Sequence, residues 1–226
     1  ANLTNAELSG VDLRQADLRH AVVINAFAPN VQVEGVRFAG ANLTGSHLII
    51  GGGMAFTFLK AKGKDVGKSL VDPGMISEAK KILANARGKT NIIFPKDFIC
   101  AKSMNHKKTS ISNSNEIASD LMGLDVGPKT IDEFSKIIRD SGTILWNGPM
   151  GVFEIKGFHM GTEKIARTIG EVTKKGSTTI VGGGDSAAAI KKFEMTNNFS
   201  HISTGGGASL SLLSGNIMPA IYALEL

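Results

Sequence analysis

Three glycine triplets are the residues best placed to do chemistry in this sequence. Gly51–Gly53, Gly182–Gly184 and Gly205–Gly207 each follow an apolar stretch and precede a segment with helical character. Glycine tolerates positive φ and lets the backbone approach a ligand closely. The first turn of a helix offers free N–H groups and a partial positive charge, which suit a phosphate. Because strand ends of a parallel sheet meet at one edge, three equivalent turns predict an edge that binds a phosphate or a nucleotide.

The second triplet continues into an acidic residue, Asp185. The run Gly182–Ala187 fits the G-x-G-x-x-A pattern of dinucleotide sites, which also requires an acidic residue about 20 positions later. No Asp or Glu lies between Glu194 and Glu225. A carboxylate beside a bare phosphate is favourable mainly when a cation bridges the two groups. The turn therefore favours the Mg²⁺ complex of a nucleotide over NAD.

The segment Trp146–Glu154, with the sequence WNGPMGVFE, is the other candidate binding loop. Two glycines and a proline predict a rigid loop at the end of a strand. Its amide Asn147, apolar Val152 and carboxylate Glu154 could meet a phosphate, a base and ribose hydroxyls, respectively. A structural turn around a buried tryptophan is the alternative interpretation.

The lysine-containing stretch Gly63–Ser69 superficially looks like a P-loop. It has three residues between its glycines where the motif needs four, and no strand leads into it. We interpret Lys64 and Lys68 as surface residues.

Beyond Leu48, strand-like apolar stretches alternate with amphipathic helical segments. The expected strands are 48–50, 91–94, 98–101, 143–146, 178–181 and 201–203, and the expected helices are 77–86, 131–139, 162–173, 186–193 and 208–213. Residues 104–124 have no clear period and are interpreted as a loop excursion, with at most a small edge strand. The alternation predicts an α/β fold, a Rossmann-like parallel sheet with flanking helices.

The start of the chain has a different texture: residues 1–50 read in ten units of five, and the pattern covers about the first 48. The first position of each unit is small or β-branched and the third is apolar, as in Ala1 and Leu3. Two inward positions in five fit neither a helix nor an alternating strand. The pattern resembles the pentapeptide-repeat family, which implies a short right-handed, four-sided (quadrilateral) β-helix that contributes fold but no chemistry. We therefore divide the chain into a repeat segment, 1–48, and a nucleotide-binding domain, 49–226.

Composition excludes several classes of protein. The formal charge of +5 is spread along the chain, and Trp146 and Tyr222 are the only Trp and Tyr, so a nucleic-acid surface with interleaved aromatics is not expected. No apolar run reaches the roughly 18–20 residues of a membrane span, and no secretory signal is visible. Cys100 is the single cysteine, which excludes a disulfide framework. These features favour a cytoplasmic protein without membrane or nucleic-acid partners, and leave the oligomeric state open.

Residues from about 48 to 226 resemble the nucleotide-binding, C-terminal domain of phosphoglycerate kinase. The matching stretches, in family order and spacing, are LIIGGGMAFTFLKA, VGKSLVD, GLDVGPKTI, TILWNGPMGVFE, TIVGGGDSAAA and SHISTGGGASLSLLSG. The resemblance implies a glycolytic phosphotransferase, in which ATP and 3-phosphoglycerate exchange with ADP and 1,3-bisphosphoglycerate.

The resemblance also implies roles for individual residues. Gly52 and Gly53 would form one wall of the adenine site, and Leu124, Pro149 and Val152 would supply its apolar contacts. Glu154 would bind the ribose, and Gly151 would belong to the same nucleotide site. Around the phosphates the resemblance places Asn147, Gly183, Gly184 and Ser186, with Asp185 holding Mg²⁺ on the nucleotide. The backbone N–H groups of Gly205, Gly206 and Gly207 would meet the phosphoryl group in flight, and His201 would lie near the hinge between domains.

The sequence also departs from the family pattern. Family members carry an N-terminal domain with a basic patch for the phosphoglycerate, and a strand, a Gly-Ala-Lys turn and a helix directly before the LIIGGG stretch. Pentapeptide repeats stand at that place here, which implies that one strand of the sheet and the lysine of the turn are absent. We therefore expect nucleotide binding, 3-phosphoglycerate only if the missing domain is supplied, and little turnover by this chain alone.

Other interpretations stay open beside this one. The abrupt junction inside a domain favours an artificial joining, a chimera, over a natural fusion. A scaffold protein, with a repeat surface and a half-kinase that only holds nucleotide, is the alternative function. A Rossmann oxidoreductase is disfavoured by the missing ribose acid.

Overall fold

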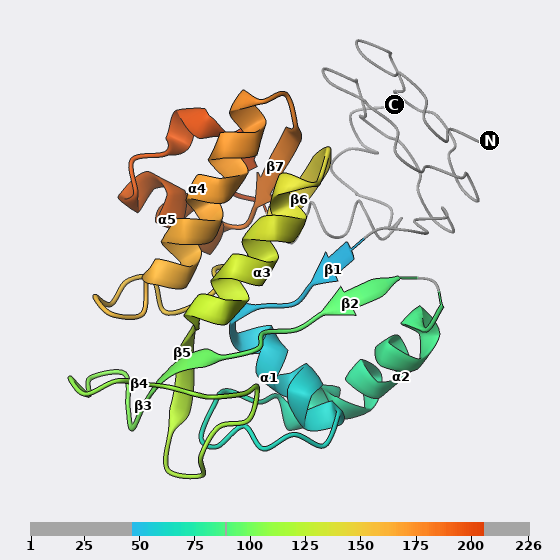
Figure 1. The fold of residues 1–226 in the computed structure, drawn as a ribbon, viewed down its shortest axis with the longest axis vertical. Coiled ribbons are helices and arrows are strands. Elements are labelled where there is room, and N and C mark those ends of the chain that lie inside the picture. The colour runs from blue at the N-terminus through green and yellow to red at the C-terminus, as the bar shows by residue number, and fades with distance from the viewer. Residues whose placement is uncertain (1–46, 89, 206–226) are drawn as a thin grey trace, which may run out of the picture.

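The computed structural model describes residues 47–88 and 90–205 (Figure 1). Residues 1–46 of the predicted β-helix, the predicted helix 208–213 and the glycines Gly206 and Gly207 lie outside these residues. Among the described residues, none of the helices has the length and apolar character that a membrane span needs. The cytoplasmic location stays a prediction.

Five parallel strands match five of the six expected ones within a residue at each end. β1 (His47–Ile49) pairs with β2 (Asn91–Ile93), and β7 (Thr178–Gly182) lies between β6 (Thr143–Asn147) and β8 (His201–Ser203). The register pairs Asn147 with Gly182 and Gly182 with Ser203. The last residues of β6, β7 and β8 therefore stand in one row at one edge of the sheet.

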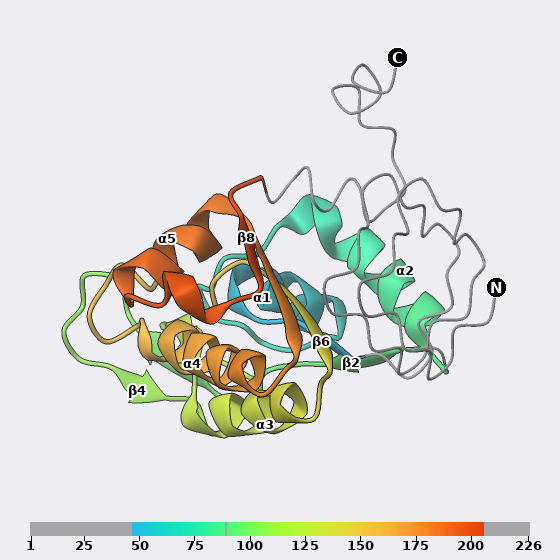
Figure 2. The ribbon, with the colours of Figure 1, turned by 90° about the horizontal axis from the view of Figure 1, so that it is seen from above.

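The strands are connected and covered by five α-helices: α1 (Gly52–Ala61), α2 (Ile76–Ala86), α3 (Pro128–Arg139), α4 (Met160–Lys174) and α5 (Gly184–Lys192). Short 3₁₀ turns, η1 (Pro73–Met75) and η2 (Thr196–Asn198), precede α2 and β8. α3 and α4 lie side by side on one side of β6 and β7, with α1 on the other (Figure 2). α1 and α5 both begin inside a glycine triplet, as expected for helices that follow strand ends.

The parallel strands form two sheets, β1–β2 and β6–β7–β8, and no strand of the described residues connects them. Ile49 and Ile93 nevertheless pack against the core that contains Trp146. Leu48 in β1 is 44% exposed and Leu145 in β6 is 45% exposed. The two sheets thus share one core while β1 and β6 each keep an edge that no described strand pairs.

A third, antiparallel sheet departs from the sequence expectation. β3 (Phe98–Ala101) lies between β4 (Ser110–Ile111) and β5 (Met122–Val126). β3 cannot join β2 in parallel, because the four residues between them are far too few for a crossover of about a dozen. β5 was not expected, because Gly and Asp are poor strand formers. Gly123 and Asp125 interrupt the apolar pattern that would otherwise indicate a strand here.

The main core lies between α3, α4 and the β6–β7–β8 sheet. Phe134, Ile165, Val181 and Ile190 are at most 1% exposed, and Trp146 is 4% exposed. Burial of each such side chain contributes about 1.5–3 kcal/mol. Because this core holds β6, β7 and α5 together, the loops at their ends have fixed starting points.

The start of α3 is fixed by a buried carboxylate, Asp97, which precedes β3 and is 1% exposed. Its oxygens accept hydrogen bonds from the N–H groups of Lys129 (3.1 Å) and Thr130 (2.8 Å) in the first turn of α3. The Thr130 hydroxyl donates to the same carboxylate at 2.7 Å. Asp97 therefore caps α3 from another segment of the chain and satisfies N–H groups that a helix start leaves free.

Candidate functional site

The aligned strand ends bring together residues that are far apart in the sequence. The Gly183 N–H, one residue beyond β7, donates to the Ser203 carbonyl at 3.0 Å. A Cβ at Gly183 would lie 3.6 Å from the Asn147 Oδ1. The side-chain amide of Asn147 thus lies beside the second glycine triplet.

The turn into α5 leaves backbone donors facing outward. Gly183 has φ +101°, which an L side chain rarely adopts, and α5 starts without a side-chain cap. Gly184 and Asp185 are exposed. An uncapped helix start with an acidic residue in its first turn can bind an anion through its N–H groups while the carboxylate holds a cation next to it.

Ser186 has a structural contact in addition to its expected role. Its side chain is fully buried, and its Oγ accepts the Gly148 N–H at 2.8 Å. The hydroxyl thus supports the loop after β6, and its donation to a phosphate stays a prediction.

The first half of that loop is fastened by side chains from two directions. Besides the bond to Ser186, Gly148 accepts a 2.7 Å hydrogen bond from the Trp146 indole N–H. Thr162 in α4 accepts from the N–H groups of Met150 (3.1 Å) and Gly151 (3.3 Å) through its hydroxyl. Trp146 therefore has a buried structural role, and its loop is still held in one conformation at the edge of the sheet.

The second half of the loop is held by β5 and α5. The Val152 N–H donates to the Leu124 carbonyl at 2.8 Å. The Lys192 ammonium, in the last turn of α5, donates to the carbonyl oxygens of Phe153 and Glu154, each at 3.0 Å. The Glu154 side chain remains exposed.

The first glycine turn meets the same loop. Gly52 has φ +59°, and a side chain there would collide with the Pro149 carbonyl oxygen. Gly53 faces Leu70, since a Cβ at Gly53 would lie 3.4 Å from the Leu70 Cδ2. Leu70 is 76% exposed, an unusual position for a leucine next to a glycine turn. Sequence reasoning missed it, because nothing in the local pattern marks this one leucine.

Two residues of β5, Leu124 and Asp125, support the loop after β6 and the start of α4. Leu124 is 5% exposed and packs with Phe158 and Val152, so its side chain lies behind Val152. Its neighbour Asp125 is 2% exposed and accepts hydrogen bonds from the N–H groups of Gly161 (2.7 Å) and Val126 (2.9 Å). Burial raises the pKa of Asp125 to about 7, and these two hydrogen bonds only partly offset the effect. Asp125 joins β5 to the start of α4, a role that the sequence did not reveal.

Magnesium would have a single carboxylate from the α5 turn. The described residues contain no group of three or more His, Cys, Asp or Glu side chains that could hold a metal ion. Mg²⁺ typically takes one or two carboxylates and completes its shell with nucleotide phosphates and water. The exposed Asp185 carboxylate beside free backbone donors fits that arrangement.

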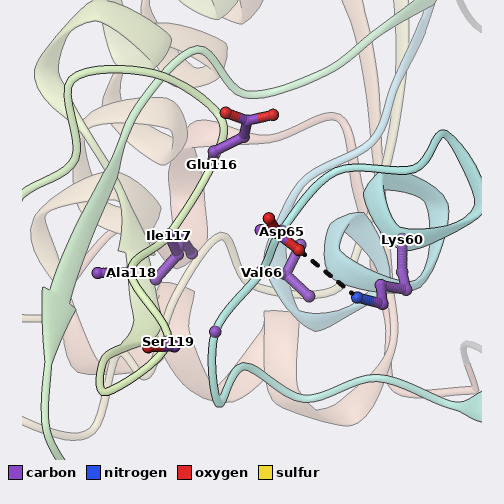
Figure 3. A pocket seen from close by; sticks show the side chains of 8 residues that line it. Lys60, Asp65, Val66, Glu116, Ile117, Ala118 and Ser119 are labelled. Atoms are coloured by element: carbon purple, nitrogen blue, oxygen red, sulfur yellow. Dashed lines mark ion pairs between the residues drawn. The ribbon is translucent and has the colours of Figure 1, made fainter.

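A cavity of about 420 Å³ lies elsewhere, near the opposite end of α1 (Figure 3). It is polar, with a 3.9 Å ion pair between Lys60 and Asp65 and a 3.0 Å pair between Lys64 and Glu116 nearby. The lysine-containing stretch 63–69 follows helix α1, so the rejection of a P-loop is confirmed. None of the three glycine triplets lines this cavity, and it is not the candidate site.

Two family models match parts of this chain. The family model "Phosphoglycerate kinase" matches residues 41–216, and a model of pentapeptide repeats matches residues 1–31. The boundary that we placed at residue 48 lies inside the kinase match and stays a prediction.

Individual relatives give the extent of the match. The chain is 48% identical over 183 residues to a phosphoglycerate kinase from Nostoc sp., covering 79% of this chain and 45% of that protein. It is 48% identical over 180 residues to one from Thermosipho africanus, covering 78% of this chain and 45% of the relative. The structure of phosphoglycerate kinase from Coxiella burnetii matches with a TM-score of 0.74 at 40% identity, over 80% of this chain and 46% of that one.

The chain thus spans somewhat less than half the length of the relatives it matches. Within that span the α/β fold, with its parallel strands and flanking helices, matches the solved phosphoglycerate kinase structure. We conclude that the chain belongs to the phosphoglycerate kinase family.

Proposed function

We propose that residues 49–226 bind Mg²⁺–ADP or Mg²⁺–ATP along the edge formed by Gly52, Asn147, Glu154 and Asp185. In the whole protein this edge would serve the exchange of a phosphoryl group between ATP and 3-phosphoglycerate, giving ADP and 1,3-bisphosphoglycerate. The observation that carries the proposal is the single row of strand ends, Asn147, Gly182 and Ser203, beside an uncapped α5.

The base and the ribose would lie where the first glycine turn meets the loop after β6. Gly52 and Gly53 present bare backbone there, and Leu70, Pro149 and Val152 offer apolar surface. The exposed Glu154 carboxylate can accept hydrogen bonds from ribose hydroxyls. Leu124 would support Val152 and Gly151 from behind.

The phosphates would lie at the start of α5. N–H groups of the uncapped first turn can donate to phosphate oxygens, and the Asn147 amide lies beside Gly183. Gly205 is exposed at the end of β8, where its N–H also reaches the Ser203 hydroxyl at 3.2 Å. Gly205, with Gly206 and Gly207 beyond the described residues, would donate to the transferring phosphoryl group.

Magnesium supplies charge neutralisation on the phosphates when it is bound. The chain's own part is to hold the Asp185 carboxylate in the first turn of α5. The helix dipole stabilises a negative charge at that position.

Turnover by these 226 residues alone is expected to be very low. Phosphoryl transfer depends on positioning and on charge stabilisation, and loss of one transition-state charge partner typically costs about 10²–10³ in rate. The matched region holds the nucleotide side of the reaction only, so 3-phosphoglycerate would act as a substrate with the remaining part of the protein present.

Calorimetry tests the proposal with ADP, ATP and NAD, each with and without Mg²⁺. We expect binding of ADP and ATP that is tighter with Mg²⁺, and none of NAD. Asp185→Asn should remove the Mg²⁺ dependence, whereas Asp132→Asn, on the surface of α3, should leave it unchanged. Affinity that is the same in Asp185→Asn with Mg²⁺ would contradict the metal role, and preference for NAD would contradict the proposed function.

A further inference from the structure

Helix α5 is fastened to the loop after β6 at two points. At its start, the buried Ser186 Oγ accepts the Gly148 N–H at 2.8 Å. At its end, the Lys192 ammonium donates to the Phe153 and Glu154 carbonyl oxygens at 3.0 Å each. The same helix therefore begins at the proposed phosphate turn and ends at the carbonyl group of the proposed ribose ligand.

The carbonyls that Lys192 contacts lie in a tight turn. The Phe153 N–H donates to Gly151 at 2.8 Å, and the Ile155 N–H donates to Val152 at 3.1 Å. These bonds use the carbonyls of Gly151 and Val152. Within the described residues, the hydrogen bonds to the next two carbonyls, those of Phe153 and Glu154, come from Lys192. The ammonium also lies 5.9 Å from the centre of the Phe153 ring.

Charge makes this contact stronger than an ordinary loop hydrogen bond. Hydrogen bonds with a charged donor are about twice as strong as neutral ones. Phe153 is 5% exposed and anchors the turn in the protein, whereas the Glu154 side chain points to solvent. With both neighbouring carbonyls held, the backbone of Glu154 has little freedom, and its carboxylate starts from a fixed position.

We propose that Lys192 is a positioning residue for the nucleotide site: by holding the two carbonyls it fixes the Glu154 carboxylate for the ribose hydroxyls. The inference rests on the proposed function for the role of Glu154. Lys192 itself touches no nucleotide in this account. A ligand that lacks the ribose hydroxyls should therefore not depend on Lys192.

Lys192→Met tests this in the full chain, because methionine keeps most of the length and the apolar character of the stem and removes the donors. We expect the Kd for Mg²⁺–ADP to rise about tenfold, since misplacement of a ligand group by a fraction of an ångström has effects of at least this size. The Kd for 2′,3′-dideoxy-ADP should change by less than twofold. In a Glu154→Ala background, Lys192→Met should have no further effect on the Kd for ADP.

Two variants control for folding and charge. Lys191→Met removes the neighbouring exposed lysine, for which the described residues show no side-chain hydrogen bond or ion pair, and should leave both Kd values unchanged. Lys192→Arg keeps a charged donor that can bridge two carbonyls, and should restore most of the ADP affinity. An equal loss for ADP and dideoxy-ADP in Lys192→Met would overturn the proposal, as would an additive loss in the Glu154→Ala background.

Hydrogen exchange separates this inference from the proposed function. The amide protons of Phe153 and Ile155 should exchange at least about tenfold faster in Lys192→Met than in the wild type, with no change in Lys191→Met. If the wild-type chain binds no nucleotide, the proposed function fails, and the role of Lys192 in site positioning fails with it. If nucleotide binds but exchange and affinity are both unchanged in Lys192→Met, only the positioning role is overturned.

Discussion

The buried carboxyl of Asp125 makes the stability of the domain depend on pH near neutrality. Its pKa lies at about 7 in the folded protein, against an ordinary value of 3.8, because burial penalises the charged form. The folded state therefore binds more protons than the unfolded state between these two values. Stability is highest at the acid end of that window, falls as pH rises through it, and levels off above the folded pKa.

The size of the effect follows from the two pKa values. Between pH 5 and pH 8, this one group should lower the free energy of unfolding by about 2–3 kcal/mol. Asp125→Asn is neutral at every pH and removes this slope. It also loses one acceptor, for either Gly161 or Val126, which costs about 1 kcal/mol at all pH values. The slope and the offset can thus be told apart.

Urea unfolding of the wild type and Asp125→Asn at intervals from pH 5 to pH 8 measures the difference directly. The wild type should lose its stability relative to the variant progressively toward pH 8. Asp132→Asn, which removes an exposed carboxylate paired with Lys136, is the control, and its difference from wild type should vary by less than about 0.5 kcal/mol. If the difference for Asp125→Asn is equally flat, the carboxyl is ionised throughout and the argument from burial is wrong.

Three further predictions concern single side chains. Asp97→Ala should lower the free energy of unfolding by about 2–4 kcal/mol in urea titrations, because it leaves one buried and one partly buried N–H group of α3 without an acceptor; a loss under about 1 kcal/mol would contradict the capping role. Glu194 is the one described non-glycine residue with positive φ, at 58°, so Glu194→Gly should raise stability by about 1 kcal/mol in thermal unfolding while Glu194→Ala should not. Cys100 is 1% exposed and burial raises the pKa of its thiol to about 11, so a thiol reagent should label it only as fast as the chain unfolds; labelling within seconds in native buffer would show an open path to the sulfur.

The repeated glycine turns made the alignment of the strand ends at one edge predictable. Each triplet carries its own signal, and strand ends of a parallel sheet meet at one edge whatever their separation in the sequence. Gly52, Asn147 and Gly183 could therefore be placed near one another before any coordinates. The expected strands 98–101 and 201–203 have the same bounds in the structure.

The groups that hold the loop in place were not predictable in the same way. Lys192 and Thr162 are ordinary helix residues. Lys192 contacts Phe153, 39 positions away, and Thr162 contacts Met150, 12 positions away. Asp125 lies in β5, whose glycine and aspartate do not indicate a strand in the sequence. Its role as a hydrogen-bond acceptor depends on Gly161 at the start of α4, 36 residues later. The resemblance implies a phosphate role for Ser186, but no sequence pattern indicated that its buried hydroxyl would accept the Gly148 N–H. Direction of a side chain is a property of packing, which the linear pattern does not contain.

An amide-resolved NMR titration of the full chain with Mg²⁺–ADP tests the central claim most directly. The account predicts shifts concentrated at the strand-end turns, at Gly52, Gly53, Asn147, Gly148, Glu154, Gly183, Gly184, Asp185 and Gly205. The residues around the cavity of Figure 3, such as Asp65 and Glu116, should not move. Shifts centred on that cavity, or no shifts at millimolar nucleotide, would contradict the assignment of the glycine turns as the nucleotide site.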